Sequence, residues 1–211
     1  MWGIIRLSVH RKKLNLVNRF RGLLPVVVDI ETTGLNPSAN GLLEIAAVSV
    51  WMDGQGHLHP GEHWFCSVEP FVDATIDPEA LIVTGIDPFS PLRYAIPEQQ
   101  ALHRIFMAVE KQLTLSQCQR AILVGHNAWF DLAFLQSAVK RSGFTKIPFH
   151  SFTTIDTASL SAVALGETVL AKALRRAKIP FDIKQAHSAE YDALKTAELF
   201  CYITNKWGLV L

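Results

Sequence analysis

Four acidic residues and one histidine lie in three short stretches of the chain that could together form a hydrolytic site. They are Asp29 and Glu31, then Asp131, then His187 and Asp192. Carboxylates that gather in one place repel each other, so such a group is stable only with a positive charge between them. Carboxylate oxygens are the ligands that Mg²⁺ and Mn²⁺ prefer in proteins. The set therefore predicts a divalent-metal site with a histidine beside it.

The first two acids follow an apolar run that is typical of a buried strand. Asp29 and Glu31 are two residues apart, and on a strand this spacing places both side chains on one face. The alternative is an aspartate that caps a turn, with Glu31 in solvent. Asp131 follows a short apolar run and a polar turn, so we expect it in the first turn of a helix. There the helix dipole alone would favour an acid.

The spacing of the last two residues constrains where they can lie. Five helical steps of ~100° would leave His187 and Asp192 roughly 140° apart around a continuous helix. Both can face one site only if His187 lies in the loop before the helix or in its distorted first turn. A histidine at a helix entrance and an exposed helical acid are the plainer interpretation of each residue alone. The joint occurrence of all five residues in this order favours the site.

The hydrophobic pattern predicts one α/β domain with a mixed sheet flanked by helices. Three early strands joined by short loops are typical of an antiparallel meander. The expected strands cover residues 23–30, 42–51, 63–68 and 121–125. The expected helices cover residues 97–113, 129–141, 168–177 and 188–206.

Composition fits a compact protein that works inside a cell. The chain has 211 residues, 49% of them hydrophobic, which suits a single domain with a sizeable core. No apolar run approaches the ~20 residues of a membrane span, and Arg6 interrupts the apolar N-terminus, which argues against a secretory signal. Three widely spaced cysteines predict neither a disulfide framework nor a zinc site. We expect a cytoplasmic protein with reduced thiols.

Charge is unevenly distributed along the chain. The net charge is +1, yet residues 1–28 contain six basic residues and no acid, so the remaining residues carry −5. We expect residues 1–18 to form a basic arm, partly disordered, ahead of a catalytic domain over 19–211. A basic arm on an acidic body fits a polyanionic substrate. A solvated basic tail is the alternative.

Three stretches resemble the motifs of the DEDDh family of 3′→5′ exonucleases, which have a ribonuclease H-like fold. They are Asp29-Ile30-Glu31, Asn127-Ala128-Trp129-Phe130-Asp131 and His187-Ser188-Ala189-Glu190-Tyr191-Asp192. The similarity extends over about residues 19–207. It implies that the four carboxylates hold two Mg²⁺ ions per active site, which Mn²⁺ can replace, and that His187 is the general base.

The resemblance also implies the substrate. It points to an exoribonuclease that trims single-stranded 3′ ends of transfer RNA, ribosomal RNA and small RNA precursors, and short single-stranded DNA 3′ ends, releasing nucleoside 5′-monophosphates. Phe130 and Phe152 match positions where aromatic rings stack on the terminal bases, and Glu79 matches an acid near those bases. Core packing is the alternative for the two phenylalanines. The family has phenylalanines at the positions of Leu35 and Val83. A base preference that depends on those two rings is therefore not expected here.

A homodimer is a further implication of the resemblance. One subunit would present a basic patch to the acidic site of the other, and Arg19, Arg21 and Arg120 match positions of that patch. The division is physically reasonable. Arginines beside the metal carboxylates would compete with the cation, whereas arginines on the partner grip upstream phosphates without disturbing it.

Two other functions remain open from the sequence. The first is a DNA proofreading exonuclease, like the editing subunit of a bacterial replicative polymerase. Such subunits usually carry a polymerase-binding tail, and only 19 residues follow Asp192 here. The second is a non-catalytic nucleic-acid-binding module, which the presence of all five chemical residues disfavours.

Overall fold

The computed structural model describes residues 15–207. Most of the predicted basic arm, residues 1–14, lies outside the described residues, as do residues 208–211. The arm's expected disorder and its boundary at residue 18 therefore stay predictions. Of this arm, the described part includes α1 (Leu16–Arg19), in which the side chain of Leu16 is buried in the core.

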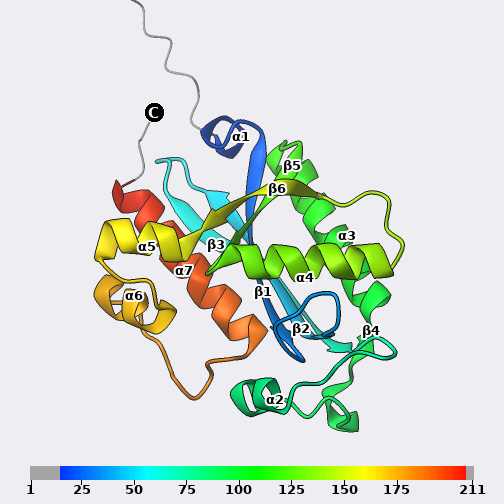
Figure 1. Ribbon diagram of the computed structural model, residues 1–211. Helices are drawn as coiled ribbons and strands as arrows, with labels where there is room; N and C mark the ends of the chain where they lie inside the picture. Colours follow the sequence, from blue (N-terminus) through cyan, green and yellow to red (C-terminus); the bar gives the residue numbers. More distant parts are fainter. Residues whose placement is uncertain (1–14, 208–211) are drawn as a thin grey trace, which may run out of the picture.

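A mixed six-stranded sheet forms the centre of the molecule, in the order β4-β3-β2-β1-β5-β6 (Figure 1). The predicted antiparallel meander is confirmed, because β2 pairs antiparallel with both β1 and β3. Strand β5 runs parallel to β1, and β6 runs parallel to β5. The strands are β1 (Leu23–Thr32), β2 (Leu42–Met52), β3 (Leu58–Glu69), β4 (Ile96–Pro97), β5 (Arg120–Gly125) and β6 (Phe149–Asp156).

Helices flank this sheet, as the sequence predicts. Helix α7 packs on β1, β2 and β3, and α5 and α6 pack on α7. Helices α3 and α4 also contact the sheet, and Figure 1 shows them to the right of α7. Besides α1, the helices are α2 (Pro78–Thr84), α3 (Glu98–Ser116), α4 (Ala128–Arg141), α5 (Thr157–Leu165), α6 (Leu170–Ala177) and α7 (Ala189–Trp207), with one 3₁₀ turn (Pro91–Arg93). The single α/β domain with a mixed sheet is therefore confirmed.

Strand β1 lies in the middle of the core. Val26, Val27 and Val28 are buried, since β1 lies between β2 and β5 with helices over the sheet. Helix α7 contributes Ala193, Ala197 and Phe200 to the same core. Small residues at helical spacing let α7 approach the sheet closely, and burial of a side chain such as Phe200 contributes roughly 1.5–3 kcal/mol.

Three elements near the site, β6, α5 and the short helix α2, escape the sequence pattern. Strand β6 lies at a sheet edge, and only Phe149 of its eight residues is fully buried, so it shows little hydrophobic periodicity. Helix α5 is rich in alanine and serine, and its Val163 is 91% exposed. Short side chains around the helix leave no distinct apolar stripe. The four predicted helices, by contrast, all occur close to their expected ranges.

Two further features of the fold concern its cysteines and the length of its apolar helices. Cys66, Cys118 and Cys201 are all buried and unpaired. Within residues 15–207, no single helix is long and apolar enough to cross a membrane, and only the bent pair α5 and α6 passes a test of length and composition together.

Candidate active site

Strand β1 delivers the first two carboxylates at its C-terminal end. Asp29 and Glu31 point to the face of the sheet opposite to buried Ile30, because successive side chains on a strand alternate. Glu44 on β2 lies directly opposite Glu31 in the antiparallel register. Three carboxylates therefore occupy one small region of the sheet.

Helix α4 brings the third predicted carboxylate against this region. Asp131 lies in the first turn of α4 and is only 5% exposed. The helix begins after Asn127, whose φ of +69° turns the chain sharply away from β5. A Cβ atom at Gly125 would lie 3.0 Å from Oδ2 of Asp131 and 3.1 Å from Cα of Ala128. Glycine at the end of β5 is therefore what permits the helix to come this close.

His187 lies in the turn before α7, where the sequence requires it to be. Its φ is +65°, and α7 begins two residues later at Ala189. The backbone N–H of His187 donates a hydrogen bond of 2.9 Å to Oδ2 of Asp192. One ligand atom each of Glu31, His187 and Asp192 lies within 4.8 Å of the others. The left-handed turn thus cancels the angular offset that a continuous helix would impose.

The carboxylates strongly perturb one another's ionisation. Burial raises the pKa of Glu31 to about 8, and the charges of Asp192, Glu44 and Asp131 add to the effect. Burial also raises the pKa of Asp131 to about 8, although hydrogen bonds from the backbone of Asp131 itself and of Ile30 oppose it. The pKa of Asp29 is raised well above its ordinary value by burial and then by the charge of Asp131. Without a cation, the cluster holds protons at neutral pH.

A buried oxygen shows that this region is suited to a cation. Oδ2 of Asp192 accepts the His187 N–H, but Oδ1 is buried and has no hydrogen-bond partner among the described residues. Burial raises the pKa of Asp192 as well. A buried acceptor without a donor costs about 1–3 kcal/mol unless something else satisfies it. The donor set of carboxylates plus one imidazole therefore fits a divalent cation.

Asp156, at the end of β6, was not identified from the sequence. Its Oδ1 accepts hydrogen bonds from the N–H groups of Ala158 (2.7 Å) and Ser159 (3.2 Å), which caps α5. Its Oδ2 accepts the N–H of Ala128 at 3.1 Å, at the start of α4. One carboxylate thus anchors two helix starts, including the helix that carries Asp131. An acidic residue at the end of a parallel strand would have indicated this position. The sequence does not reveal β6 as a strand, however, because its residues show little hydrophobic periodicity.

His126 lies in the turn before α4 and is held there by hydrogen bonds. Nε2 of His126 donates to the carbonyl oxygen of Thr168 at 2.8 Å, and Nδ1 lies 3.0 Å from Oγ1 of Thr157. Burial lowers the pKa of His126. This ring therefore ties the turn before α4 to the starts of α5 and α6.

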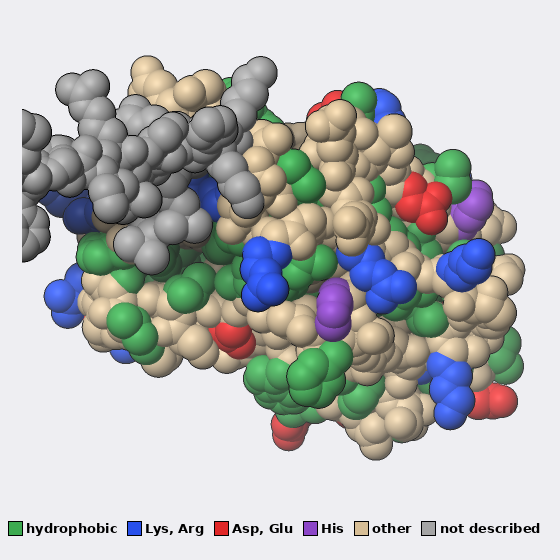
Figure 2. All heavy atoms as spheres, turned by 90° about the horizontal axis from the view of Figure 1, so that it is seen from above, with side chains coloured by type: hydrophobic (Ala, Val, Ile, Leu, Met, Phe, Trp, Pro, Cys, Tyr) green, Lys and Arg blue, Asp and Glu red, His purple; other side chains and the backbone are tan. Residues whose placement is uncertain are grey.

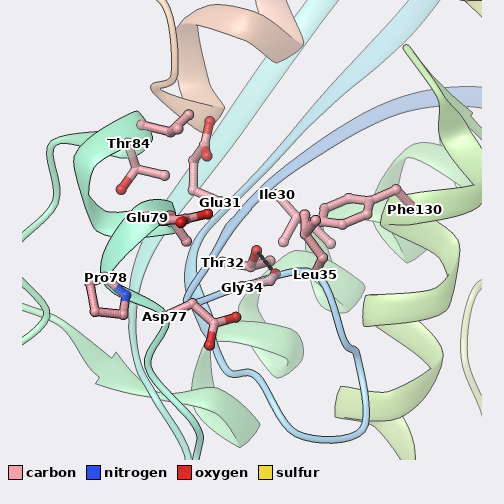
Figure 3. Close-up of a pocket in the computed structure, with 12 residues that line it drawn as sticks. Ile30, Glu31, Thr32, Gly34, Leu35, Asp77, Pro78, Glu79, Thr84 and Phe130 are labelled. Atoms are coloured by element: carbon pink, nitrogen blue, oxygen red, sulfur yellow. Dashed lines mark hydrogen bonds between the residues drawn. The ribbon is translucent and has the colours of Figure 1, made fainter.

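A pocket of about 640 Å³ opens beside the carboxylates. Its size is within the roughly 300–1,000 Å³ of small-ligand sites. In Figure 3, Leu35 and Phe130 lie at one end, and Glu79 projects from α2 toward β1. A Cβ atom at Gly34 would lie 2.0 Å from Oδ2 of Asp77, so glycine allows the loop after β1 to contact the start of α2. Phe130, Glu79 and Glu31 thus line the same pocket.

Two aromatic side chains lie outside this pocket lining. Phe152 on β6 is 85% exposed and is not among the residues that line the pocket. Trp129, which the sequence interpretation passed over, is 67% exposed and packs edge-on against Phe130 with ring centroids 5.9 Å apart. Core packing, the alternative for the phenylalanines, is excluded for Phe152. It holds in part for Phe130, which also contacts Phe134.

The three predicted patch arginines lie at the other end of the sheet. Arg21 and Arg120 are exposed. Arg120 is the first residue of β5 and pairs with Leu23, the first residue of β1, which follows Arg21 by two positions. A strand rises about 3.3 Å per residue, so roughly 20 Å separates the start of β1 from Asp29. Figure 2 views this end and shows Lys and Arg side chains spread across the face. These arginines are therefore remote from the carboxylates of their own chain.

Arg19 has an unexpected position within this end. Its guanidinium donates to the carbonyl oxygens of Gly56 and, at 3.1 Å, Thr204. These bonds tie α1 to the β2–β3 turn and to the end of α7. The contacts favour a structural role for Arg19, and its contact with phosphate stays a prediction.

Comparisons with known proteins agree with the fold and this site. A family model described as exonuclease matches residues 26–200. The chain therefore belongs to this exonuclease family, as the motifs predict, and it is a 3′→5′ exonuclease, a hydrolase. Divalent-metal dependence is typical of the family and agrees with the carboxylate cluster.

Relatives within the family carry a more particular name. Ribonuclease T of Hahella chejuensis is 54% identical over 95% of this chain and 92% of the relative. Ribonuclease T of Vibrio parahaemolyticus is 51% identical over 95% of this chain and 94% of the relative.

Solved structures support the fold independently. E. coli exonuclease I in complex with a dT13 oligonucleotide matches with a TM-score of 0.67 at 18% identity, over 87% of this chain and 41% of that chain. Exonuclease I from Methylocaldum szegediense gives a TM-score of 0.64 at 18% identity, over 88% of this chain and 41% of that one. The present chain thus spans about two fifths of these longer proteins.

Proposed function

We propose that this protein removes nucleotides one at a time from single-stranded 3′ ends of RNA precursors, with transfer RNA among them, and from short single-stranded DNA 3′ ends. The observation that carries the proposal is the convergence of Glu31, His187 and Asp192 within 4.8 Å of one another. Similarity to proteins named ribonuclease T over nearly the whole chain supports RNA as the main substrate.

Two Mg²⁺ ions, for which Mn²⁺ can substitute, would supply an activated water and neutralise charge on the scissile phosphate. Asp29 lies centrally among the carboxylates and would contact both ions. Glu31 and Asp192 would hold one ion, the latter through its unpaired Oδ1. Asp131 would hold the other.

His187 has the exposure and position of a general base. It is exposed at the rim of the cluster, and its backbone is fixed by the hydrogen bond to Asp192. The imidazole would take the proton of the attacking water. Breakage of the bond to the 3′ oxygen then leaves the phosphate on the departing nucleotide, a 5′-monophosphate.

The pocket beside the carboxylates would hold the terminal nucleotide. Leu35 is 82% exposed and Val83 is 57% exposed, so the pocket offers aliphatic surface where aromatic rings would stack more strongly. Phe130 supplies one ring in the lining, and Glu79 can accept hydrogen bonds from a base. Aliphatic walls favour a broad base preference, since they give apolar contact without the geometry of stacking.

We further propose a homodimer in which the Arg21 and Arg120 end of one subunit holds the strand that enters the other subunit's site. The ~20 Å separation within one chain supports this arrangement. Within a single subunit, a bound strand would have to extend along the whole sheet before one of its upstream phosphates could reach these arginines.

One assay compares this proposal with the DNA-proofreading alternative. Purified protein is given a duplex RNA with a 3′ overhang and, separately, a DNA primer with a mismatched 3′ end on its template. We expect rapid overhang removal that slows at the duplex, with 5′-monophosphates as products. Faster removal of the mismatched DNA terminus than of the RNA overhang would favour proofreading.

A further inference from the structure

Glu44 contacts the start of the helix that carries the last two site residues. Oε2 of Glu44, on β2, accepts a hydrogen bond of 3.0 Å from the backbone N–H of Ala189. Ala189 is the first residue of α7, so this N–H is one that the helix itself cannot satisfy. His187 and Asp192 flank Ala189 in the sequence.

The register of the sheet connects Glu44 to the metal carboxylates. Glu44 and Glu31 are direct partners in the antiparallel pair of β1 and β2. Like charges in directly opposite positions destabilise a sheet. The positive end of the α7 dipole offsets the charge of Glu44, while the charge of Glu31 faces His187 and Asp192. The two glutamates therefore have different surroundings, because Glu44 accepts from a helix start whereas Glu31 lies beside another carboxylate.

Among the described residues, one ion pair joins a side chain of the sheet to the first turn of α7. His63 on β3 lies 3.1 Å from Glu190, but their side chains are 47% and 43% exposed. Ion pairs at such exposure contribute little, because solvent screens them. The bond of Glu44 is less accessible to water, and its acceptor is a carboxylate that approaches the helix from a strand of the sheet.

We propose that Glu44 is a positioning residue, which fixes the start of α7 on the sheet so that His187 and Asp192 meet Glu31. The role rests on the proposed function of His187 and Asp192 in the same site. Glu44 would act through the geometry of α7, and not as a ligand of the cation. Its Oε2 already accepts the N–H of Ala189.

Two substitutions with side chains of similar length distinguish the effect of the Glu44 hydrogen bond from the effect of its charge. Glu44→Gln keeps a side-chain oxygen that can accept the Ala189 N–H but removes the charge. Glu44→Met removes the acceptor and the charge together. We expect Glu44→Gln to retain kcat within about 3-fold, whereas Glu44→Met loses roughly 10- to 100-fold in kcat, since a misplacement near 1 Å can cost 10²-fold. KM for the 3′-overhang RNA should change less than kcat in both.

A control at the far end of α7 tests whether general loosening of the helix explains the result. Asn205 accepts from the N–H of Leu58 (2.7 Å) and donates to its carbonyl oxygen (2.8 Å), which links the end of α7 to β3. Asn205→Leu removes this link without touching the site. We expect it to lower thermal stability at least as much as Glu44→Met and to leave kcat nearly unchanged.

Amide hydrogen exchange provides a readout that does not require activity. Exchange in the first turn of α7 should accelerate in Glu44→Met but not in Glu44→Gln. The proposal is overturned if the Gln and Met variants lose kcat equally, because the charge would then matter. It is also overturned if Glu44→Met retains wild-type kcat, or if Asn205→Leu loses as much kcat. A wild-type protein inactive on RNA would instead refute the proposed function, and the exchange result would still decide the structural role.

Discussion

The backbone N–H of His187 and Oδ2 of Asp192 form a 2.9 Å hydrogen bond across five residues of sequence. The bond closes the left-handed turn that begins α7 and occupies one oxygen of the carboxylate. The other oxygen, Oδ1, is buried without a partner among the described residues. One oxygen of Asp192 therefore shapes the turn, and the other is available to a cation.

This division predicts how Asp192 responds to substitution. Asp192→Asn keeps an oxygen for the His187 N–H but weakens a cation ligand. We expect kcat to fall by at least ~10²-fold, together with a higher Mn²⁺ concentration for half-maximal activity, because ligand charge contributes to cation affinity. Calorimetric titration with Mn²⁺ measures the affinity directly. Unchanged Mn²⁺ binding would mean that Asp192 does not hold the cation.

Thermal stability of the metal-free protein should fall as pH rises. Glu31 has an ordinary pKa of 4.5 and a pKa of about 8 in the fold. Below 4.5 this group is protonated in both folded and unfolded states, and above about 8 it is ionised in both. Between these values the folded state holds the extra proton, so the free energy of unfolding decreases across this window.

Added Mg²⁺ should counteract that loss. A divalent cation offsets the carboxylate repulsion, so the increase in Tm on adding Mg²⁺ should grow between pH 5 and 8. Melting curves in chelator and in Mg²⁺ across this range test the point, with Asp131→Asn as a variant whose curve in chelator should be flatter. A metal-free Tm that rises over the same range would contradict the ionisation described for Glu31 and Asp131.

His187→Ala should separate catalysis from metal binding. We expect a loss of ~10²-fold or more in kcat, because a positioned base is missing, with Mn²⁺ affinity changed far less than in Asp192→Asn. His103→Ala, an exposed histidine on α3, is the matched control and should keep wild-type rates. Wild-type turnover by His187→Ala would remove this residue from the mechanism.

The two phenylalanines predicted to stack on bases should contribute to single-strand binding. Phe130→Ala and Phe152→Ala should each lose ~1–3 kcal/mol in binding a single-stranded oligonucleotide, measured with an uncleavable analogue. Leu35→Phe should tighten binding by adding a ring beside the pocket. Trp51→Ala serves as the control, because Trp51 is 51% exposed on β2 and stacks on His59. Equal binding by all variants would show that none of these rings contacts a base.

Mixing two inactive variants tests the dimer. Asp29→Asn lacks a working metal site, and Arg21→Ala/Arg120→Ala lacks the two exposed patch arginines. If the patch of one subunit serves the other, mixed dimers should regain activity, and the double arginine variant should bind RNA with a salt slope about two units flatter. Arg104→Ala/Lys111→Ala on α3 removes the same charge elsewhere and should bind normally. No gain in activity after demonstrated subunit exchange would show that each subunit serves its own site.

The sequence by itself determined the elements that carry the chemistry. Alternation along β1 puts Asp29 and Glu31 on one face, and helical spacing of apolar residues marks α3, α4 and α7. These patterns are local, because side-chain direction repeats every two residues on a strand and every 3.6 on a helix. The position of His187 before its helix also follows from its spacing to Asp192, given that both residues face one site. Strand β6 and helix α5 could not be inferred, because an edge position and short side chains leave no periodic signal.

Only the tertiary structure decided which distant groups meet. Glu44 reaches Ala189 across 145 residues of sequence, and Arg19 reaches Thr204 across 185. One contact places a strand acid beside the carboxylate cluster, and the other links α1 to α7 through an arginine that is also predicted to bind phosphate. The energy of such bonds comes from pairing donors and acceptors that folding has removed from water. Which donor meets which acceptor depends on how strands and helices pack together, and spacing along the chain does not encode it.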